Sequence, residues 1–191
     1  MFAHIFEHFY NSAILLSVQQ IEAIAGAMYT RQPVCRMLVF GCGNDSPLWF
    51  ALNKKGRTVF LETSVAWINK VRSNASSLEI CHYELPENVS VSSCLEADTL
   101  PEVNPPAVLF EEEWDVILID GPPGFQPGQP GRALPIMWAS QVRSSRTHVF
   151  LHDFQRPLEK LYGTKYLNIT CQIEHDKAPA GLLGWSIGRL L

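Results

Sequence analysis

Short apolar runs alternate with helical patterns along most of the chain. Apolar side chains at three- and four-residue spacing predict a first helix from about Asn11 to Met28. Beyond it, apolar runs bounded by turn residues are typical of strands buried on both faces of a parallel sheet. The predicted strands are 35–40, 57–62, 80–83, 114–120, 148–153, 169–173 and 182–187, and the predicted further helices are 46–52, 65–71, 134–142 and 158–162.

This alternation predicts an α/β three-layer sandwich, with a mostly parallel, seven-stranded, Rossmann-like sheet between two layers of helices. The length of 191 residues suits one domain. We expect an N-terminal helical segment over 1–33 and an α/β core over 34–191. With 47% hydrophobic and 18% charged residues, global disorder is excluded.

Charge narrows the choice of partner. Fifteen Lys and Arg against nineteen Asp and Glu give a net charge of −4, whereas a protein that grips phosphate backbones is normally basic. We therefore expect a small-molecule or carbohydrate partner and no nucleic acid.

No apolar run is long enough for a membrane span, and the start does not resemble a signal peptide, so the predicted location is the cytoplasm. The five cysteines form no CxxC pair and are expected to be reduced thiols.

In open parallel sheets the ligand lies beyond the carboxyl ends of the strands, where strand order reverses. The first predicted strand leads into Gly41, Cys42 and Gly43, which allow a tight turn, and the second ends at Glu62. A GxG turn with a distal acid fits S-adenosylmethionine (SAM) or NAD, and also a purely structural turn. Ser46 stands where a dinucleotide fingerprint has its third glycine, which weakens the NAD interpretation.

Two further strand ends carry candidate chemistry. Asp120 enters a Pro- and Gly-rich loop that ends at Arg132, and His152 and Asp153 end a later strand. Adjacent strand residues point to opposite sides, so at most one of His152 and Asp153 is expected to face a given pocket, unless the chain turns there. These groups fit either an acid/base or divalent-metal site, or a structural arrangement in which Asp120 caps the loop and His152 is a buried, satisfied histidine.

Two other features have simple interpretations. Glu111 to Glu113 form a solvated acidic run. Trp49, Trp67 and Trp138 fall on apolar helical faces and are expected mainly in the core, although one of them could line a sugar or adenine pocket.

Several segments together resemble a known family. The segments are 38–49, 51–53, 56–62, 114–120, 130–132 and 149–153, and they include Phe-Gly-Cys-Gly-Asn-Asp-Ser, Trp-Asp-Val-Ile-Leu-Ile-Asp and Val-Phe-Leu-His-Asp. In this order they are similar to the plant glucuronoxylan 4-O-methyltransferase family. The resemblance implies the class I SAM-dependent methyltransferase fold and methylation of a hydroxyl of a uronic acid, glycoside or related small molecule, assisted by a divalent metal such as Mg, Mn or Co.

The resemblance also implies roles for individual residues. Asp120, His152, Asp153 and Arg132 would be catalytic, with Arg132 on an acceptor carboxylate, and Asp120, His152 and Asp153 would bind the metal. The implied cofactor-binding residues are Phe40, Gly41, Cys42, Gly43, Asp45, Ser46, Glu62 and Asp120. The alternative function is a non-catalytic SAM-fold binding or scaffold protein in polysaccharide assembly. Plant members carry a Golgi membrane anchor, so a Golgi location is expected only for a domain excised from an anchored protein.

Overall fold

The computed structural model describes residues 14–97, 100–169, 171–174 and 186–190. They form one seven-stranded sheet in the order β3-β2-β1-β4-β5-β7-β6. The strands are β1 (Arg36–Phe40), β2 (Arg57–Glu62), β3 (Glu79–His82), β4 (Val116–Ile119), β5 (His148–His152), β6 (Cys171–Glu174) and β7 (Ser186–Leu190). The first five run parallel, and β7 is antiparallel to both of its neighbours. The predicted α/β fold is confirmed.

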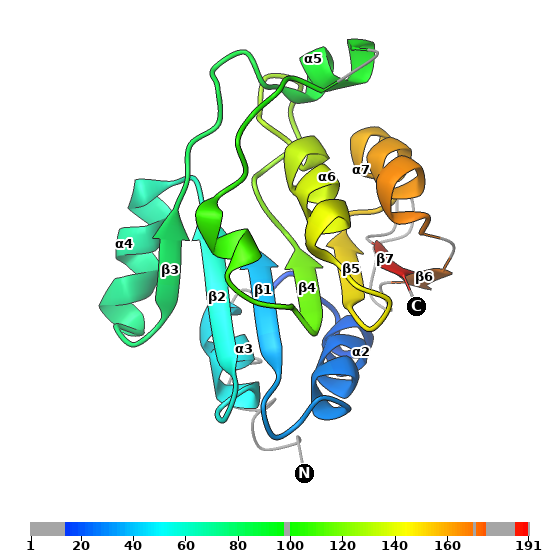
Figure 1. The fold of residues 1–191 in the computed structure, drawn as a ribbon. Coiled ribbons are helices and arrows are strands. Elements are labelled where there is room, and N and C mark those ends of the chain that lie inside the picture. Colours follow the sequence, from blue (N-terminus) through cyan, green and yellow to red (C-terminus); the bar gives the residue numbers. More distant parts are fainter. Residues whose placement is uncertain (1–13, 98–99, 170, 175–185, 191) are drawn as a thin grey trace.

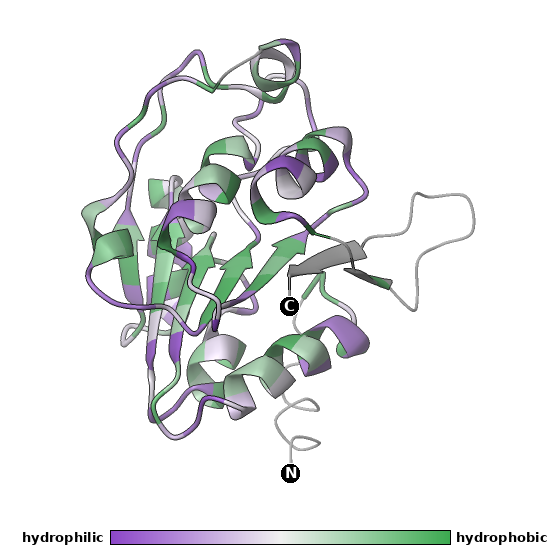
Figure 2. Cartoon of the chain, turned by 45° about the vertical axis from the view of Figure 1, so that its right-hand side comes forward, coloured by the Kyte–Doolittle hydropathy of each residue, from purple (hydrophilic) through white to green (hydrophobic). Residues whose placement is uncertain are grey.

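Helices cover both faces of the sheet (Figure 1). The described helices are α2 (Val18–Tyr29), α3 (Ser46–Leu52), α4 (Val65–Asn74), α5 (Val91–Glu96), η1 (Ala107–Phe110), α6 (Ala133–Val142), α7 (Pro157–Tyr162) and η2 (Gly163–Leu167). Side chains of α2, α3 and α4 share one core with one face of the strands, whereas α5, η1, α6 and α7 share a second core with the other face. Figure 2 shows the apolar strands between these layers.

Alternation along each strand produces the two cores. In β1, Leu38 and Phe40 enter one core while Met37 and Val39 enter the other, and all four are buried. The continuous apolar runs in the sequence therefore mark strands that are covered on both faces.

The observed elements differ from the prediction in a few places. The first helix begins at Val18 because Ser17 caps it, with Gln20 completing a reciprocal capping box; positions 11–13 of its predicted start lie outside the described residues. The last strand begins at Ser186; the predicted positions 182–185 also lie outside them. The short helices α5 and η1 were not predicted. None of the helices in the described part of the chain has the length and apolar character needed to cross a bilayer.

Strand register aligns the functional edge. Phe40 of β1 lies opposite Leu61 of β2 and Ile119 of β4, and Ile119 lies opposite Leu151 of β5. The next residue of each strand is therefore part of one row along the carboxyl edge, in the order Glu62, Gly41, Asp120 and His152. The strand order reverses between β1 and β4, where open parallel sheets bind ligands.

Candidate cofactor and acceptor site

The turns after β1 and β4 touch at the centre of this edge. Gly41 has a φ of +102°, which favours glycine, and a Cβ on Gly121 would lie 2.7 Å from the Gly41 Cα. The Asp120 N–H donates to the Phe40 carbonyl at 2.9 Å, which continues the pairing of the strands to this point. Glycine is therefore needed on both sides of the contact, and the two turns together form the floor of the site.

The turn after β1 faces an open cavity. Gly41, Cys42, Gly43 and Asp45 all line it. The Gly43 N–H donates to the Ser46 Oγ at 2.9 Å, which holds the turn against the start of α3.

Two of the predicted cofactor residues do not line this cavity. The Phe40 side chain is completely buried in the sheet core, and Ser46 lies beneath the turn as its hydrogen-bond support. Phe40 and Ser46 therefore support the glycine turn from beneath, and neither faces the cavity.

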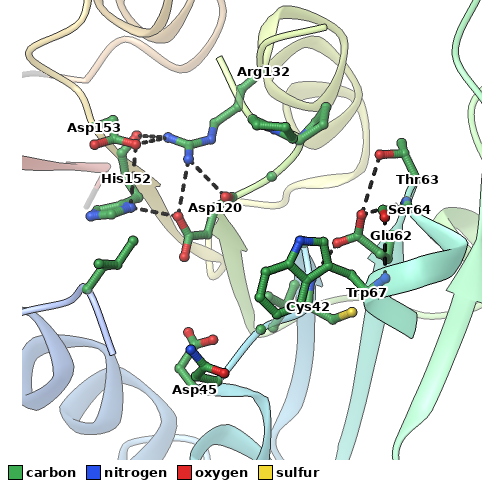
Figure 3. Close-up of a pocket in the computed structure, with 18 of the residues that line it drawn as sticks. Cys42, Asp45, Glu62, Thr63, Ser64, Trp67, Asp120, Arg132, His152 and Asp153 are labelled. Carbon is green, nitrogen blue, oxygen red and sulfur yellow. Dashed lines mark hydrogen bonds and ion pairs between the residues drawn. The ribbon is translucent and has the colours of Figure 1, made fainter. Parts of the chain in front are cut away.

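Glu62 joins the ends of β1 and β2 (Figure 3). Its carboxylate accepts hydrogen bonds from the Cys42 N–H at 2.9 Å and from the Ser64 N–H at 2.7 Å. The Thr63 hydroxyl also donates to this carboxylate, at 3.4 Å. A carboxylate has about four lone-pair sites, so these three bonds still leave acceptor capacity for a hydroxyl group in the cavity. Thr63, Ser64 and Trp67 line the same side of the cavity.

The cavity has a volume of about 500 Å³ and extends across the ends of four strands. This volume is in the range of small-molecule and cofactor sites. It joins Glu62 and the glycine turn on one side to Asp120, His152 and Arg132 on the other (Figure 3). The strand-end residues predicted as separate candidates are thus brought together in one space.

A buried charged cluster forms the second half of the site. The His152 Nδ1–H donates to Asp120 Oδ1 at 2.6 Å, and Arg132 Nη1 donates to Asp153 Oδ2 at 2.7 Å. The chain turns at Asp153, which has a φ of +59°, so His152 and Asp153 both line the cavity. Strand alternation allows both side chains to face one pocket only where the chain turns, and the turn at Asp153 meets that condition.

The electrostatics of the cluster follow from this pairing. Burial lowers the pKa of His152, but the Asp120 and Asp153 carboxylates outweigh burial and raise the pKa above its ordinary value of 6.5. Burial raises the pKa of Asp153, but Arg132, His152 and Arg156 outweigh it and hold that pKa below its ordinary value. At neutral pH the cluster therefore contains ionised Asp153 beside two guanidinium groups.

On the other side of the cavity, burial raises the pKa of Asp45 to about 6, and the nearby Asp120 charge adds to this rise. The Asp45 carboxylate accepts a hydrogen bond from Trp49 Nε1 at 2.7 Å, which acts in the opposite direction.

Arg132 is placed differently from its predicted role. Its side chain is only 5% exposed, and its two terminal nitrogens donate to the His152 and Asp120 carbonyls and to both nearby carboxylates. Its Nε is buried without a hydrogen-bond partner among the described residues, and its terminal nitrogens already have partners inside the protein, so its environment does not match the predicted contact with an acceptor carboxylate. Arg132 instead holds the ends of β4 and β5 together.

The cluster offers a donor set for a divalent cation. One ligand atom each of Asp120, His152 and Asp153 lies within 4.8 Å of the others. Asp120 Oδ2 and Asp153 Oδ1 accept no hydrogen bond from the described residues. Oxygen ligands with one imidazole suit Mg, Mn or a harder transition metal. These residues therefore fit such an ion, although Arg132 and Arg156 offset the charge of Asp153.

Sequence analysis missed several residues of the cavity wall. Phe125 at 66% exposure and Leu15 at 60% both line the cavity. Trp67 was not missed in the same way: Trp49 and Trp138 are buried as expected, and Trp67, at 40% exposure, is the one of the three tryptophans that lines the cavity. Arg156, just beyond β5, also lines it. The rule that identified Asp120 selects residues directly after a strand. Arg156 lies several positions beyond the end of β5, so the rule does not reach it.

The strand order and the ligand-binding edge define the class of fold. A TehB-like SAM-dependent methyltransferase from Corynebacterium glutamicum has a similar structure, with a TM-score of 0.53 over 98% of this chain and 94% of that chain. Sequence identity between the two is 9%, so the likeness shows a shared fold alone. The protein has the class I SAM-dependent methyltransferase fold, as the family resemblance implied.

The family is more specific than the fold. A family model described as IRX15/IRX15L/GXM matches residues 19–96 and 86–178, and the chain belongs to this family. Arabinogalactan O-methyltransferase 2 from Arabidopsis thaliana is 33% identical over 177 residues, which are 79% of this chain and 60% of that protein. Glucuronoxylan 4-O-methyltransferase 1 from the same plant is 30% identical over 182 residues, which are 83% of this chain and 64% of that protein. The chain thus spans less than two thirds of the length of these relatives.

Proposed function

We propose that the protein is a SAM-dependent O-methyltransferase that transfers a methyl group to a hydroxyl of a carbohydrate acceptor bearing a uronic acid. The observation that carries this proposal is the single cavity that joins Glu62 and the glycine turn to the Asp120–His152 pair. Methyl transfer from SAM to a hydroxyl requires that the cofactor and the acceptor are held together and that a nearby group accepts the hydroxyl proton. This cavity has a side for the cofactor and a side that can accept the proton.

The cofactor side is built from Glu62, Asp45 and Trp67. Glu62 accepts a hydrogen bond from a ribose hydroxyl with the acceptor capacity that its contacts inside the protein leave unused. Trp67 offers an exposed aromatic face beside Glu62 to the adenine (Figure 3). Asp45 lies where its carboxylate can attract the positive charge of SAM.

The acceptor side is built around Asp120, whose side chain is 25% exposed. The acceptor oxygen attacks the methyl carbon, the carbon–sulfur bond breaks, and its electron pair stays on sulfur as S-adenosylhomocysteine forms. The hydroxyl proton passes to the Asp120 carboxylate, which His152 and Arg132 hold in place. A positioned base of this kind contributes about 10²–10⁴-fold, and alignment of the two reactants contributes more.

A divalent cation at Asp120, His152 and Asp153 would supply Lewis acidity that makes the acceptor hydroxyl easier to deprotonate. Because Arg132 and Arg156 already neutralise Asp153, we expect this cation to bind weakly without the other components of the reaction. Chelator treatment is therefore expected to lower methyl transfer more than it lowers protein stability.

The carbohydrate acceptor is suggested by the names of the relatives, which refer to glucuronoxylan and arabinogalactan. Phe125 gives independent support. It lies on the loop after β4, lines the cavity and is 66% exposed, although large aromatic side chains are usually buried. An exposed ring at the rim of a polar cavity suits the apolar face of a sugar.

The first experiment is calorimetric titration of chelator-treated protein with SAM and S-adenosylhomocysteine, with and without Mg²⁺, Mn²⁺ or Co²⁺. We expect micromolar binding of both nucleosides. Mass spectrometry of a glucuronic-acid-bearing xylo-oligosaccharide then tests transfer, with its carboxyl-reduced counterpart as the control acceptor. Absence of nucleoside binding under all conditions would contradict the proposal, and the non-catalytic alternative predicts binding of the oligosaccharide without transfer.

A further inference from the structure

Arg132 and Arg156 both contact Asp153, but they differ in how many hydrogen-bond donors remain for a ligand. Arg132 is 5% exposed, and both of its terminal nitrogens donate to oxygens of the protein. The side chain of Arg156 is 25% exposed, lines the cavity, and makes one ion pair among the described residues, from Nη2 to Asp153 Oδ2 at 3.0 Å. A guanidinium has five donors, so Arg156 keeps most of its donors for a ligand.

Local structure holds Arg156 at this position. The residue caps the start of α7, and its backbone N–H donates to the Asp153 carbonyl at 2.9 Å. The side-chain bond to Asp153 spans the same three residues, so main chain and side chain together fix the guanidinium beside the end of β5. Part of the ordering cost of an Arg–ligand contact is thereby met before the ligand binds.

The charges around Arg156 leave room for an anion. Asp153 is a single carboxylate that receives bonds from two guanidinium groups. Glu159, on the same helix, is completely buried, and burial raises the pKa of its carboxyl group despite the nearby Arg132 and Arg156. Arg132 pairs with both Asp120 and Asp153, whereas Arg156 has only a share of the Asp153 carboxylate. Of the two guanidinium groups, that of Arg156 is therefore the less neutralised one, and it lines the cavity.

The position of Arg156 identifies the ligand group. Along the edge of the sheet the cofactor residues stand at the ends of β2 and β1, the proposed base stands at the end of β4, and Arg156 follows β5. An anion on Arg156 thus lies on the far side of Asp120 from the ribose site. We propose that Arg156 binds the carboxylate of the acceptor and selects uronic acids over neutral sugars. A planar guanidinium matches a carboxylate through two parallel hydrogen bonds.

This inference rests on the proposed function, because it names the acceptor group that the same site recognises. The test uses the wild type, Arg156→Gln, Arg156→Lys and Arg146→Gln. Arg146 is a matched control, since it is an exposed arginine paired to Glu113 at the opposite edge of the sheet. Calorimetry with saturating S-adenosylhomocysteine compares a glucuronic-acid-bearing xylo-oligosaccharide with its carboxyl-reduced counterpart.

We expect the wild type to prefer the acidic oligosaccharide and Arg156→Gln to lose about 10- to 100-fold of that preference, the effect of losing a hydrogen bond to a charged group. Arg156→Lys keeps a positive charge beside Asp153 but loses the planar guanidinium, so it should lose part of the preference. If Arg156→Gln does not fold, Arg156→Lys serves as the test variant. Arg146→Gln should keep all of it. The affinity for S-adenosylhomocysteine should be the same in all four proteins.

Two outcomes would overturn the inference. The first is a preference that is absent in the wild type or unchanged in both Arg156 variants. The second is a loss of S-adenosylhomocysteine affinity larger than the loss of oligosaccharide affinity, which would place Arg156 on the cofactor's own carboxylate. Binding of the acidic oligosaccharide through Arg156 without any methyl transfer would contradict the proposed function and leave this inference intact.

Discussion

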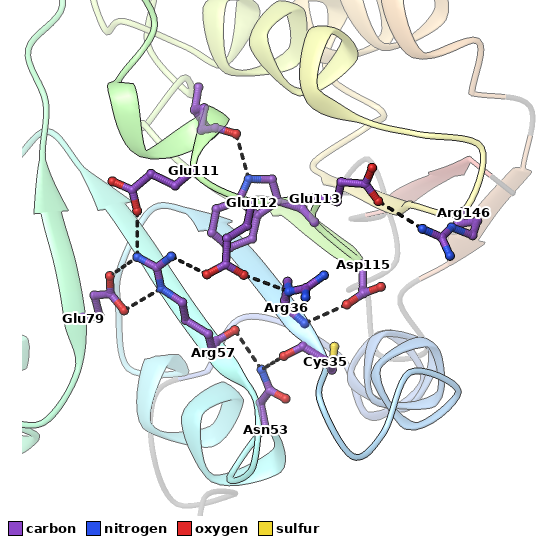
Figure 4. A network of polar contacts seen from close by, with 12 residues as sticks. Cys35, Arg36, Asn53, Arg57, Glu79, Glu111, Glu112, Glu113, Asp115 and Arg146 are labelled. Atoms are coloured by element: carbon purple, nitrogen blue, oxygen red, sulfur yellow. Dashed lines mark hydrogen bonds and ion pairs between the residues drawn. The ribbon is translucent and has the colours of Figure 1, made fainter.

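The two edges of the sheet both carry arginines paired with carboxylates, but they differ in burial. At the amino edge, Arg57 contacts three glutamates, Glu79, Glu111 and Glu112, and each of these four side chains is 27–51% exposed (Figure 4). At the carboxyl edge, Arg132, His152 and Asp153 are 3–5% exposed. All four side chains of the amino edge are partly solvated, whereas at the carboxyl edge three charged side chains are buried, and their partners Asp120 and Arg156, which also line the cavity, are each 25% exposed.

This difference separates a surface network from a site. Exposed ion pairs contribute about 0–1 kcal/mol each, because water screens them and the side chains lose conformational freedom. Buried charges cost several kcal/mol in desolvation, and their mutual attraction does not reliably exceed that cost. A buried charged cluster that also lines a cavity is therefore better explained by chemistry than by stability.

Of the variants that test the difference between the two edges, loss of the Asp120 carboxylate should have the largest effect on activity. Asp120→Asn keeps the size of the side chain but removes the proposed base and the partner of His152. We expect the rate of methyl transfer, kcat, to fall by about 10²–10⁴-fold, measured as initial rates with saturating SAM and acceptor.

The matched change at the amino edge is Glu112→Gln, which alters a carboxylate that pairs with Arg36 and Arg57. It should leave kcat within about a factor of two, as surface changes usually do. Nearly equal rates in wild type and Asp120→Asn would remove Asp120 from the mechanism.

The next largest effect concerns the cofactor side. The Cys42 N–H donates to one oxygen of Glu62 and the Ser64 N–H donates to the other, so Glu62→Gln keeps an acceptor for one of them but loses the other acceptor and the charge. We expect SAM to bind about 10- to 100-fold more weakly, as for loss of a hydrogen bond to a charged group. Calorimetry measures the change directly.

Glu79→Gln is the control for this change. It stands at the start of β3, where its carboxylate pairs with Arg57 far from the cavity. SAM affinity should not change in this variant. Equal losses in both variants would show a general effect of charge or of folding and would contradict a ribose contact at Glu62.

Much of the carboxyl edge could be predicted from sequence, because parallel strands end at a common edge. Gly41, Glu62, Asp120 and His152 each follow an apolar run, and the register places them in one row. The fold could be predicted for the same reason, since alternation of strands and helices leaves few topologies.

The remaining features depend on tertiary contacts. Trp67 lies on an apolar helical pattern, but within α4 the buried residues are Ile68 and Val71, and the Trp67 side chain is 40% exposed and lines the cavity. The positive φ at Asp153 turns the chain and cancels the alternation expected from β5. Arg132 and Arg156 are both arginines near strand ends, and only the packing around them decides which one keeps donors for a ligand.

A smaller effect is expected from Asp45, with a defined pH dependence. Its pKa in the folded protein is about 6, above the ordinary value of 3.8, so ionisation costs folding free energy as the pH rises through this range. Asp45→Asn keeps an oxygen for Trp49 Nε1 and removes this cost.

We expect Asp45→Asn to be more stable than the wild type by about 1–3 kcal/mol at pH 7.5 and nearly equal to it at pH 4, from the free energy of a shift of this size. Urea unfolding without ligand measures both values. Because the carboxylate is also proposed to attract the positive charge of SAM, SAM should bind the variant more weakly at pH 7.5. A variant that gains stability equally at both pH values would show that ionisation of Asp45 is not the cause.

The smallest effect is expected at the amino edge, where Arg57→Gln removes the centre of the glutamate network. Four close charges form more than an isolated pair, and the Arg57 guanidinium also lies 6.0 Å from the centre of the Trp114 ring. Even so, side chains that are this exposed keep much of their hydration, so we expect a loss of only about 1 kcal/mol. In a protein of this size that corresponds to a fall in Tm of about 2–4 °C. The loss should shrink in 1 M NaCl, where the Debye length is about 3 Å. A salt-independent loss of several kcal/mol would mean that the amino edge also has a buried electrostatic function, and the distinction between the two edges would then fail.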